Sequence, residues 1–151
     1  MNYQRSTRYA LYAAIEMAAA APGELVTAAA VSEKYQLPPT VLAKVFQRLV
    51  QEKLAHGTRG VTGGYRLARH PAEVTVLEVV EIFEGRRTES RCALASCDEG
   101  TCGLYAECRL RLLFDEVDQQ ARATFGSVTL ATLVSPRSPL VAPPSRLTTA
   151  A

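Results

Sequence analysis

All four cysteines of this 151-residue chain lie in one short segment, RCALASCDEGTCGLYAEC, at residues 91–108. Their spacing is Cys92-x4-Cys97-x4-Cys102-x5-Cys108. Thiolates are soft ligands that favour iron–sulfur clusters and zinc. The segment therefore predicts one of three kinds of chemistry: a disulfide framework, a metal centre or a thiol/disulfide switch.

The length of the chain and the cysteine spacing narrow this choice. A chain of 151 residues with 48% hydrophobic residues can bury a core without disulfide bonds, and disulfide frameworks belong mainly to small secreted domains. The spacing lacks the C-x2-C pairs of common zinc sites and forms a looser loop that could enclose a larger group. These observations weaken the disulfide framework and leave an iron–sulfur cluster, a thiol/disulfide switch and a zinc site open as interpretations.

The apolar N-terminal run YALYAAIEMAAAAPG does not match a secretion signal, because Glu16 interrupts it. No apolar stretch approaches the ~18 residues needed to span a bilayer. We expect a cytoplasmic protein with no membrane partner, in a reducing compartment where thiols are free to bind metal.

Charge is unevenly distributed along the chain. Residues 1–70 hold nine Lys and Arg against four Glu, a net charge of +5, whereas residues 71–151 hold eight Arg against eleven Asp and Glu, a net charge of −3. A basic first half suits a polyanion such as DNA.

The basic half of the chain has the pattern of a helix-turn-helix. Helices are expected at about 7–20, 27–36 and 39–53, and Leu11, Ile15 and Ala18 share one face of the first. Thr27 is expected to cap the second helix. The LPPT break then precedes the third helix, where a proline suits the first position. The third helix has an apolar face of Leu42, Val45, Phe46, Leu49 and Val50, and an outward face of Thr40, Lys44, Gln47, Arg48 and Gln51.

A hairpin is expected next, in LAHGTRGVTGGYRLAR at 54–69. Two short strand-like pieces flank a glycine-rich turn, with Arg59 near the tip and Arg66 beyond it. A hairpin that follows a helix-turn-helix forms a wing, and its tip can enter a minor groove, where the negative potential attracts arginine.

The rest of the chain predicts three more helices, one of which is expected to pair with its copy in a second subunit. A capping box, T-V-L-E, begins a helix at Thr75 that should bury Val76, Val79, Val80 and Phe83 and end at Gly85. A long helical pattern at about 104–125 has an apolar stripe too long for a small head to cover, which predicts a homodimer. The stripe consists of Leu110, Leu113, Phe114, Val117, Ala121 and Phe125. VTLATLV at 128–134 predicts a last short helix capped by Thr129.

These segments together resemble the IscR/NsrR/CymR type, or Rrf family, of winged helix-turn-helix transcriptional regulators. The resemblance lies in STRYALYAAIEMA, LPPTVLAKVFQRL, TRGVTGGYRLAR, TVLEVVEIFEG, the cysteine segment and VTLATLV, and it covers about residues 1–134. It implies a mainly α fold with a small β-hairpin. It also implies a homodimer that binds double-stranded DNA at a palindromic operator.

The resemblance also suggests a division of the chain. Residues 1–85 form the winged helix-turn-helix head, 86–108 the cysteine-rich cluster loop, and 109–134 the dimerisation helix and a short terminal helix. Residues 135–151 contain four prolines and no periodicity and are expected to be disordered.

The DNA-binding residues implied by the resemblance lie on the third helix and the wing. Thr40 and Lys44 would face base edges, and Arg59 would enter the minor groove. The IscR type has a glutamate on this helix where the present chain has Ala43, and alanine cannot accept a hydrogen bond from cytosine. The complete candidate set is Thr40, Lys44, Arg48, Arg59, Gly60, Gly63, Gly64 and Tyr65.

The cysteine segment departs from both comparison types. The IscR type has a histidine three residues after its last cysteine, where this chain has Tyr105, and the NsrR type can use an acidic residue of the partner's first helix, where this chain has Arg8. Cys97, Cys102 and Cys108 match the NsrR spacing, and Cys92 is additional. We therefore expect all four cysteines to hold a 2Fe-2S or 4Fe-4S cluster within one subunit.

The predicted function is a sequence-specific transcriptional regulator whose DNA affinity depends on the cluster or on the redox state of the cysteines. Two alternatives remain: a cluster-free thiol-switch regulator, and an electron-transfer or cluster-delivery protein that uses its winged helix as an interaction module. An enzyme is not expected, because no nucleophile–base pair or phosphate loop is present.

Overall fold

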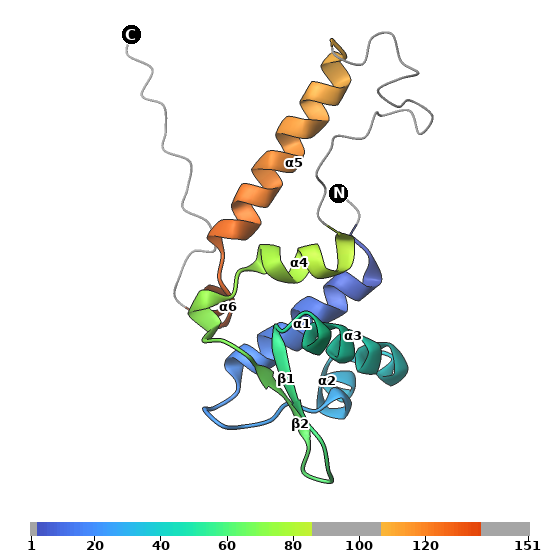
Figure 1. The fold of residues 1–151 in the computed structure, drawn as a ribbon, viewed down its shortest axis with the longest axis vertical. Coiled ribbons are helices and arrows are strands. Elements are labelled where there is room, and N and C mark those ends of the chain that lie inside the picture. The colour runs from blue at the N-terminus through green and yellow to red at the C-terminus, as the bar shows by residue number, and fades with distance from the viewer. Residues whose placement is uncertain (1–2, 86–106, 137–151) are drawn as a thin grey trace.

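The computed structural model describes residues 3–85 and 107–136. Within these ranges the protein is mainly α-helical with one two-stranded hairpin, as the sequence predicted. Figure 1 shows a head made by most elements and one helix, α5, that rises out of it. The elements are α1 (Arg5–Ala19), α2 (Ala28–Tyr35), α3 (Pro39–Gln51), β1 (Ala55–Thr58), β2 (Gly64–Leu67), a 3-10 turn η1 (Pro71–Glu73), α4 (Val76–Glu84), α5 (Arg109–Ser127) and α6 (Leu130–Val134).

Helix α1 lies at the centre of the head and contacts α3, α4 and α6. Its fully buried residues are Thr7, Ala10, Ala13, Ala14 and Met17. Leu11, Ile15 and Ala18, which the sequence grouped on one face, are only partly buried. The alanines are buried instead because short side chains let several helices approach α1 closely.

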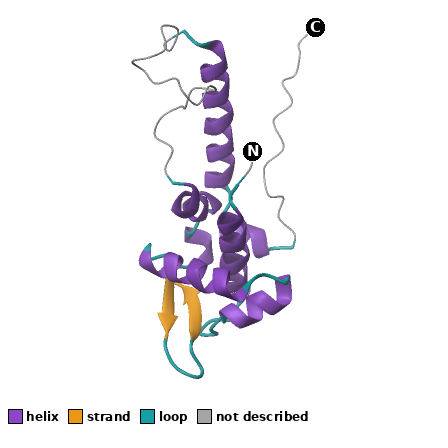
Figure 2. Cartoon of the chain, turned by 90° about the vertical axis from the view of Figure 1, so that its right-hand side faces the viewer, coloured by secondary structure: helices purple, strands orange, loops and turns teal. Residues whose placement is uncertain are grey.

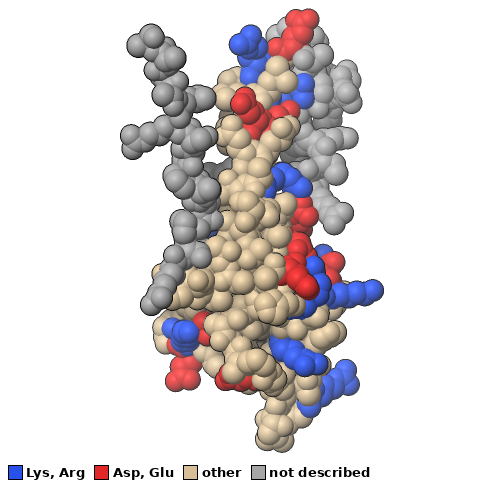
Figure 3. Space-filling view, turned by 90° about the vertical axis from the view of Figure 1, so that its left-hand side faces the viewer, with Lys and Arg blue, Asp and Glu red and all other residues tan. Residues whose placement is uncertain are grey.

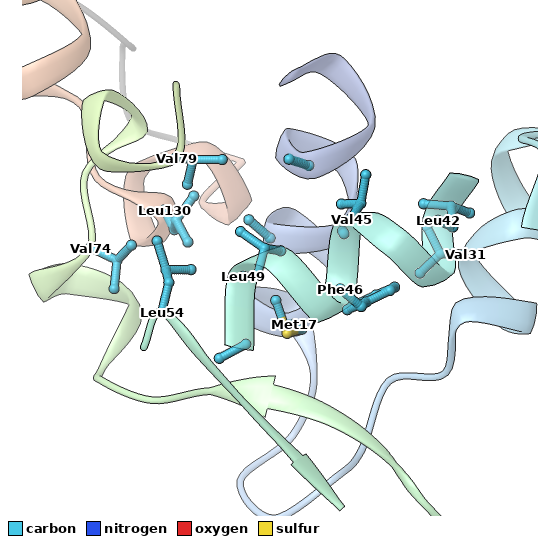
Figure 4. Close-up of a cluster of buried hydrophobic side chains, with 14 residues drawn as sticks. Met17, Val31, Leu42, Val45, Phe46, Leu49, Leu54, Val74, Val79 and Leu130 are labelled. Atoms are coloured by element: carbon cyan, nitrogen blue, oxygen red, sulfur yellow. The ribbon is translucent and has the colours of Figure 1, made fainter. Parts of the chain in front are cut away.

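The core is built largely from α3 and closed by residues from distant parts of the chain. Leu42, Val45, Phe46 and Leu49 of α3 are all buried, which confirms the predicted apolar face. Figure 4 shows them beside Met17 of α1, Val79 of α4 and Leu130 of α6. The short helix α6 therefore packs into the head.

Local interactions define both ends of α2 and the start of α3. Thr27 caps α2 as expected, its side chain accepting a hydrogen bond from the backbone N–H of Ala30 at 3.1 Å. Gln36 ends the helix in the left-handed conformation, with φ of 54°. Pro39 occupies the first turn of α3, where its missing N–H is not needed.

The wing is an antiparallel pair in which Ala55 faces Leu67 and Thr58 faces Gly64. A third piece of chain joins it, because Val26 and Tyr65 exchange two backbone hydrogen bonds of 2.8 and 2.9 Å. The hairpin is therefore attached to the head along β2, while its tip extends away from the helices (Figure 2).

The predicted boundaries of α4 and α6 are confirmed. Thr75 and Glu78 form the capping box of α4, and Gly85 ends the helix with φ of 80°. Thr129 caps α6 by accepting a hydrogen bond from the Thr132 N–H at 3.2 Å.

Helix α5 begins at Arg109, later than the expected start near 104; residues 104–106 lie outside the described residues. Its 19 residues include no buried one. Leu110, Leu113, Phe114 and Val117 of the predicted apolar stripe are between 43 and 57% exposed in the single chain. No helix in the described parts of the chain is long and apolar enough to cross a membrane.

Candidate DNA-binding surface and cysteine segment

The outward face of α3 carries three of the predicted DNA-binding side chains. Thr40, Lys44 and Arg48 are exposed and follow one another at four-residue intervals, so they lie along one side of the helix. Arg48 forms an ion pair with Glu52 at 3.1 Å, in which both side chains are more than 40% exposed. Exposed pairs of this kind contribute about 0.3–0.5 kcal/mol. Arg48 can therefore exchange Glu52 for a phosphate at little energetic cost.

The tip of the wing carries Arg59 and Val61, both exposed. Its turn requires glycine, since Gly60 has φ of 122° and a Cβ at Gly63 would lie 2.3 Å from the carbonyl oxygen of Thr58. The two glycines thus shape the tip that presents Arg59 to solvent. Figure 3 shows several Lys and Arg side chains projecting from the lower half of the molecule, the end that carries the wing.

Gly64 and Tyr65 attach the wing to the head. A Cβ at Gly64 would lie 2.9 Å from both Leu25 Cβ and the Val26 carbonyl oxygen. The Tyr65 ring stacks on Phe46 of α3, with ring centroids 4.3 Å apart and an interplanar angle of 16°. The wing and α3 are therefore held in one geometry by these residues. Direct contact of Gly60, Gly63, Gly64 and Tyr65 with DNA stays a prediction.

A group of hydrogen-bonded side chains that joins α2 to α1 was not predicted from the sequence. The Glu16 carboxylate accepts hydrogen bonds from Lys34 Nζ at 2.7 and 2.9 Å and from the Tyr35 hydroxyl at 2.6 Å. The Tyr35 ring also lies 4.4 Å from that of Tyr12. The hydrogen bond to Glu16 raises the pKa of Tyr35 to about 12. Burial raises the pKa of Glu16, but its hydrogen bonds outweigh this and lower the pKa below 4.5 overall.

The two histidines lie on the surface of the head. His56 and His70 are both exposed, and His70 Nδ1 accepts a hydrogen bond from the Ala72 N–H at 3.2 Å. Over residues 3–85 and 107–136, no group of three or more His, Cys, Asp or Glu side chains is arranged to hold a metal ion.

Of the four predicted cysteine ligands, Cys108 lies within the described residues; Cys92, Cys97 and Cys102 lie outside them. Cys108 is the N-cap residue of α5, and its half-buried thiol is free and makes no capping hydrogen bond. Helical periodicity continued back by one residue puts Cys108 on the side of α5 opposite the apolar stripe. Leu112, one turn later on that same side, is exposed.

Arg8, which replaces the acidic ligand of the NsrR type, is exposed near the start of α1. Its guanidinium donates a hydrogen bond to the Tyr3 carbonyl oxygen at 3.2 Å. A permanently protonated guanidinium has no lone pair to offer a metal, so Arg8 is no substitute for that ligand.

The chain matches known regulators over most of its length. It is 34% identical over 134 residues to "Putative HTH-type transcriptional regulator BadM" of Rhodopseudomonas palustris, covering 89% of this chain and 81% of that protein. The oxidized form of Staphylococcus aureus CymR has a similar fold, with a TM-score of 0.71, 19% identity and coverage of 92% of this chain and all of that one. The IscR of T. potens has a TM-score of 0.67 at 19% identity, covering 89% and 86% of the two chains.

These structural likenesses confirm the winged-helix fold. The model of the Rrf2 family, described as iron-dependent transcriptional regulators, matches residues 3–136. The chain therefore belongs to the Rrf2 family of transcriptional regulators.

Proposed function

We propose that the chain is a homodimeric, sequence-specific regulator that binds a palindromic operator through α3 and the wing. Each part of the chain has the role that the sequence predicts for it. Residues 1–85 contact DNA, 86–108 hold an iron–sulfur cluster, and α5 pairs with its copy while α6 packs on the head. The state of the cluster sets the affinity for DNA.

The observation that carries the DNA-binding part is the rigid link between two exposed surfaces. The Phe46–Tyr65 stack fixes the wing relative to α3, so Lys44 and Arg59 approach a duplex as one unit. A recognition helix in the major groove beside a wing arginine in the minor groove is the arrangement that this link supports. Half-sites about one helical turn apart then require two such heads.

The exposed apolar stripe of α5 supports the dimer. A soluble chain rarely exposes a continuous apolar face, and a two-fold copy of the same helix would cover it. Leu113→Arg should therefore give a monomer in sedimentation experiments. Gln119→Arg adds the same charge on the opposite, exposed side of α5 and should leave the dimer intact. A Leu113→Arg protein that remains dimeric would contradict this use of the helix.

The donor set fits an iron–sulfur cluster. Cysteine thiolates are its usual protein ligands, and the Cys108 thiol has no capping hydrogen bond that binding would break. When bound, such a cluster supplies a one-electron redox centre. Cys92, Cys97, Cys102 and Cys108 would hold it, and the exposed Leu112 would limit access of water from the side that Cys108 occupies.

A thiol switch without metal is the second candidate for regulation. It is favoured by the similar fold of CymR, which is known in an oxidized form. The two candidates differ in composition, because the switch needs no iron or sulfide. Both use the same cysteines, so substitution of cysteine alone does not separate them.

Protein purified without oxygen tests the proposal. We expect visible absorption, stoichiometric iron and sulfide, and a difference in gel-shift affinity between cluster-loaded and apo protein on the same operator. A colourless, iron-free protein whose affinity still responds to oxidants would favour the thiol switch. Preference for one sequence over competitor DNA separates both regulators from an electron-transfer or cluster-delivery protein.

A further inference from the structure

We propose that the ion pair between Glu81 of α4 and Arg122 of α5 sets the angle between the head and α5, and thereby the half-site spacing that the dimer accepts. Arg122 Nη2 contacts Glu81 Oε1, although the two residues are 41 positions apart in the sequence. The inference rests on the proposed dimer and its palindromic operator, and it concerns two residues outside the DNA-contacting surfaces.

The head contacts α5 in the C-terminal half of the helix, where Asp118, Arg122 and Phe125 line a cavity shared with α4. Besides the ion pair, Phe125 makes an edge-to-face contact with Tyr3, with ring centroids 5.6 Å apart. Past the helix, the Val128 carbonyl oxygen accepts a hydrogen bond from the Val76 N–H at 2.9 Å. The angle of α5 therefore depends on contacts in the C-terminal half of the helix.

Apolar packing fills this junction only in part: Val76, Val80 and Val128 form a buried cluster against which Tyr3 and Phe125 pack. A cavity of about 100 Å³ lies between α4 and α5, and Glu81 and Arg122 are among its lining residues together with Leu77, Val80 and Phe125. Tightly interdigitated side chains fix a helix crossing angle, whereas an incompletely filled junction allows it to vary. The ion pair is a directional contact between side chains of α4 and α5, and its Glu81 and Arg122 side chains are 16% and 39% exposed.

Helix α4 is attached to the head by its glutamates. Its glutamates recur every three residues and reach different neighbours. Glu78 pairs with Arg69 at the base of the wing, and Glu84 accepts a hydrogen bond of 2.8 Å from the Gln4 N–H at the start of α1. Glu81, between them, connects this unit to α5.

The length of α5 converts a small change of angle into a large displacement. Its 19 residues span about 28 Å. A tilt of about 10° at the junction would move the far end by roughly 5 Å, more than the 3.4 Å rise of one base pair. A dimer joined along α5 would then bring its two recognition helices to a different spacing.

The test uses the palindromic site that wild-type protein selects from random DNA. Affinity is measured for this operator and for versions with the centre lengthened or shortened by one base pair. Glu81→Gln and Arg122→Gln are expected to reduce the preference for native spacing at least threefold, with unchanged salt dependence and dimer assembly. Glu81→Arg combined with Arg122→Glu should restore the preference. Glu78→Gln, which leaves the α5 contact in place, is the matched control.

Two outcomes would overturn the proposal. The first is wild-type spacing preference in both single variants. The second is an equal loss of affinity for all three operators, because a merely structural role weakens binding without changing the preferred spacing. Circular dichroism and sedimentation establish that each variant is a folded dimer. If wild-type protein selects no palindrome, the proposed function itself fails, and that result is distinguishable from either outcome.

Discussion

The close approach of the wing to the head gives a sharp prediction for Gly64→Ala. The added Cβ would lie 2.9 Å from Leu25 Cβ and from the Val26 carbonyl oxygen, and the latter is backbone that is paired with Tyr65. Gly64 does not have positive φ, so the penalty is steric and not conformational. Overpacking of this size typically costs about 1–3 kcal/mol, and we expect the free energy of unfolding to fall by about that amount.

Denaturant unfolding at equal protein concentration measures the effect, since the stability of the proposed dimer would depend on concentration. Gly126→Ala in α5 is the matched control, because its nearest contact would be Leu77 Cδ2 at an ordinary 3.6 Å. This alanine should leave stability unchanged or raise it by about 0.5–1 kcal/mol. A Gly64→Ala protein within about 0.5 kcal/mol of wild type would refute the packing argument. If its DNA affinity fell nonetheless, Gly64 would act by touching DNA.

Three further predictions follow from the same structure. Glu16→Gln should lower the free energy of unfolding at pH 7 by about 1 kcal/mol. Because the pKa of Glu16 is lowered in the folded protein, the difference between variant and wild type should shrink as pH falls below 4.5. A difference that stays constant with pH would contradict this reasoning. Arg59→Ala should weaken operator binding and reduce the slope of log affinity against log salt concentration by about 0.9, as measured by titration of labelled DNA. An unchanged slope would mean that Arg59 makes no phosphate or groove contact. Thr75→Ala removes the capping box of α4 and should cost about 1 kcal/mol in thermal unfolding, whereas Thr75→Ser should cost much less.

Local sequence rules predicted much of the fold correctly. The caps at Thr27, Thr75 and Thr129, the proline start of α3 and the glycine end of α4 each follow from interactions within four residues, and the structure has all of them. The amphipathic pattern of α3 was equally reliable, because its apolar face is contiguous and its polar face is exposed.

Interactions between distant residues could not be predicted in this way. The Phe46–Tyr65 stack, the Glu16 cluster and the Arg122–Glu81 pair each join residues that only tertiary packing brings together. The same holds for α1. Hydrophobic periodicity grouped Leu11, Ile15 and Ala18 on one face, and Leu11 and Ala18 do pack against the core. The periodicity did not indicate that neighbouring helices bury Ala10, Ala13 and Ala14 more completely.

The chain between Gly85 and Cys108 joins the two sides of the α4–α5 junction. The segment leaves the head at Gly85, which lines the junction cavity, and returns at Cys108, at the far end of a helix about 28 Å long. Its two ends are therefore attached to the two bodies whose angle the Glu81–Arg122 pair fixes. A cluster or disulfide that alters the separation of these ends must act against that ion pair. Weakening the pair should accordingly make the spacing preference respond more strongly to the state of the cysteines, whereas an unaltered response would mean that their state reaches the DNA by another route.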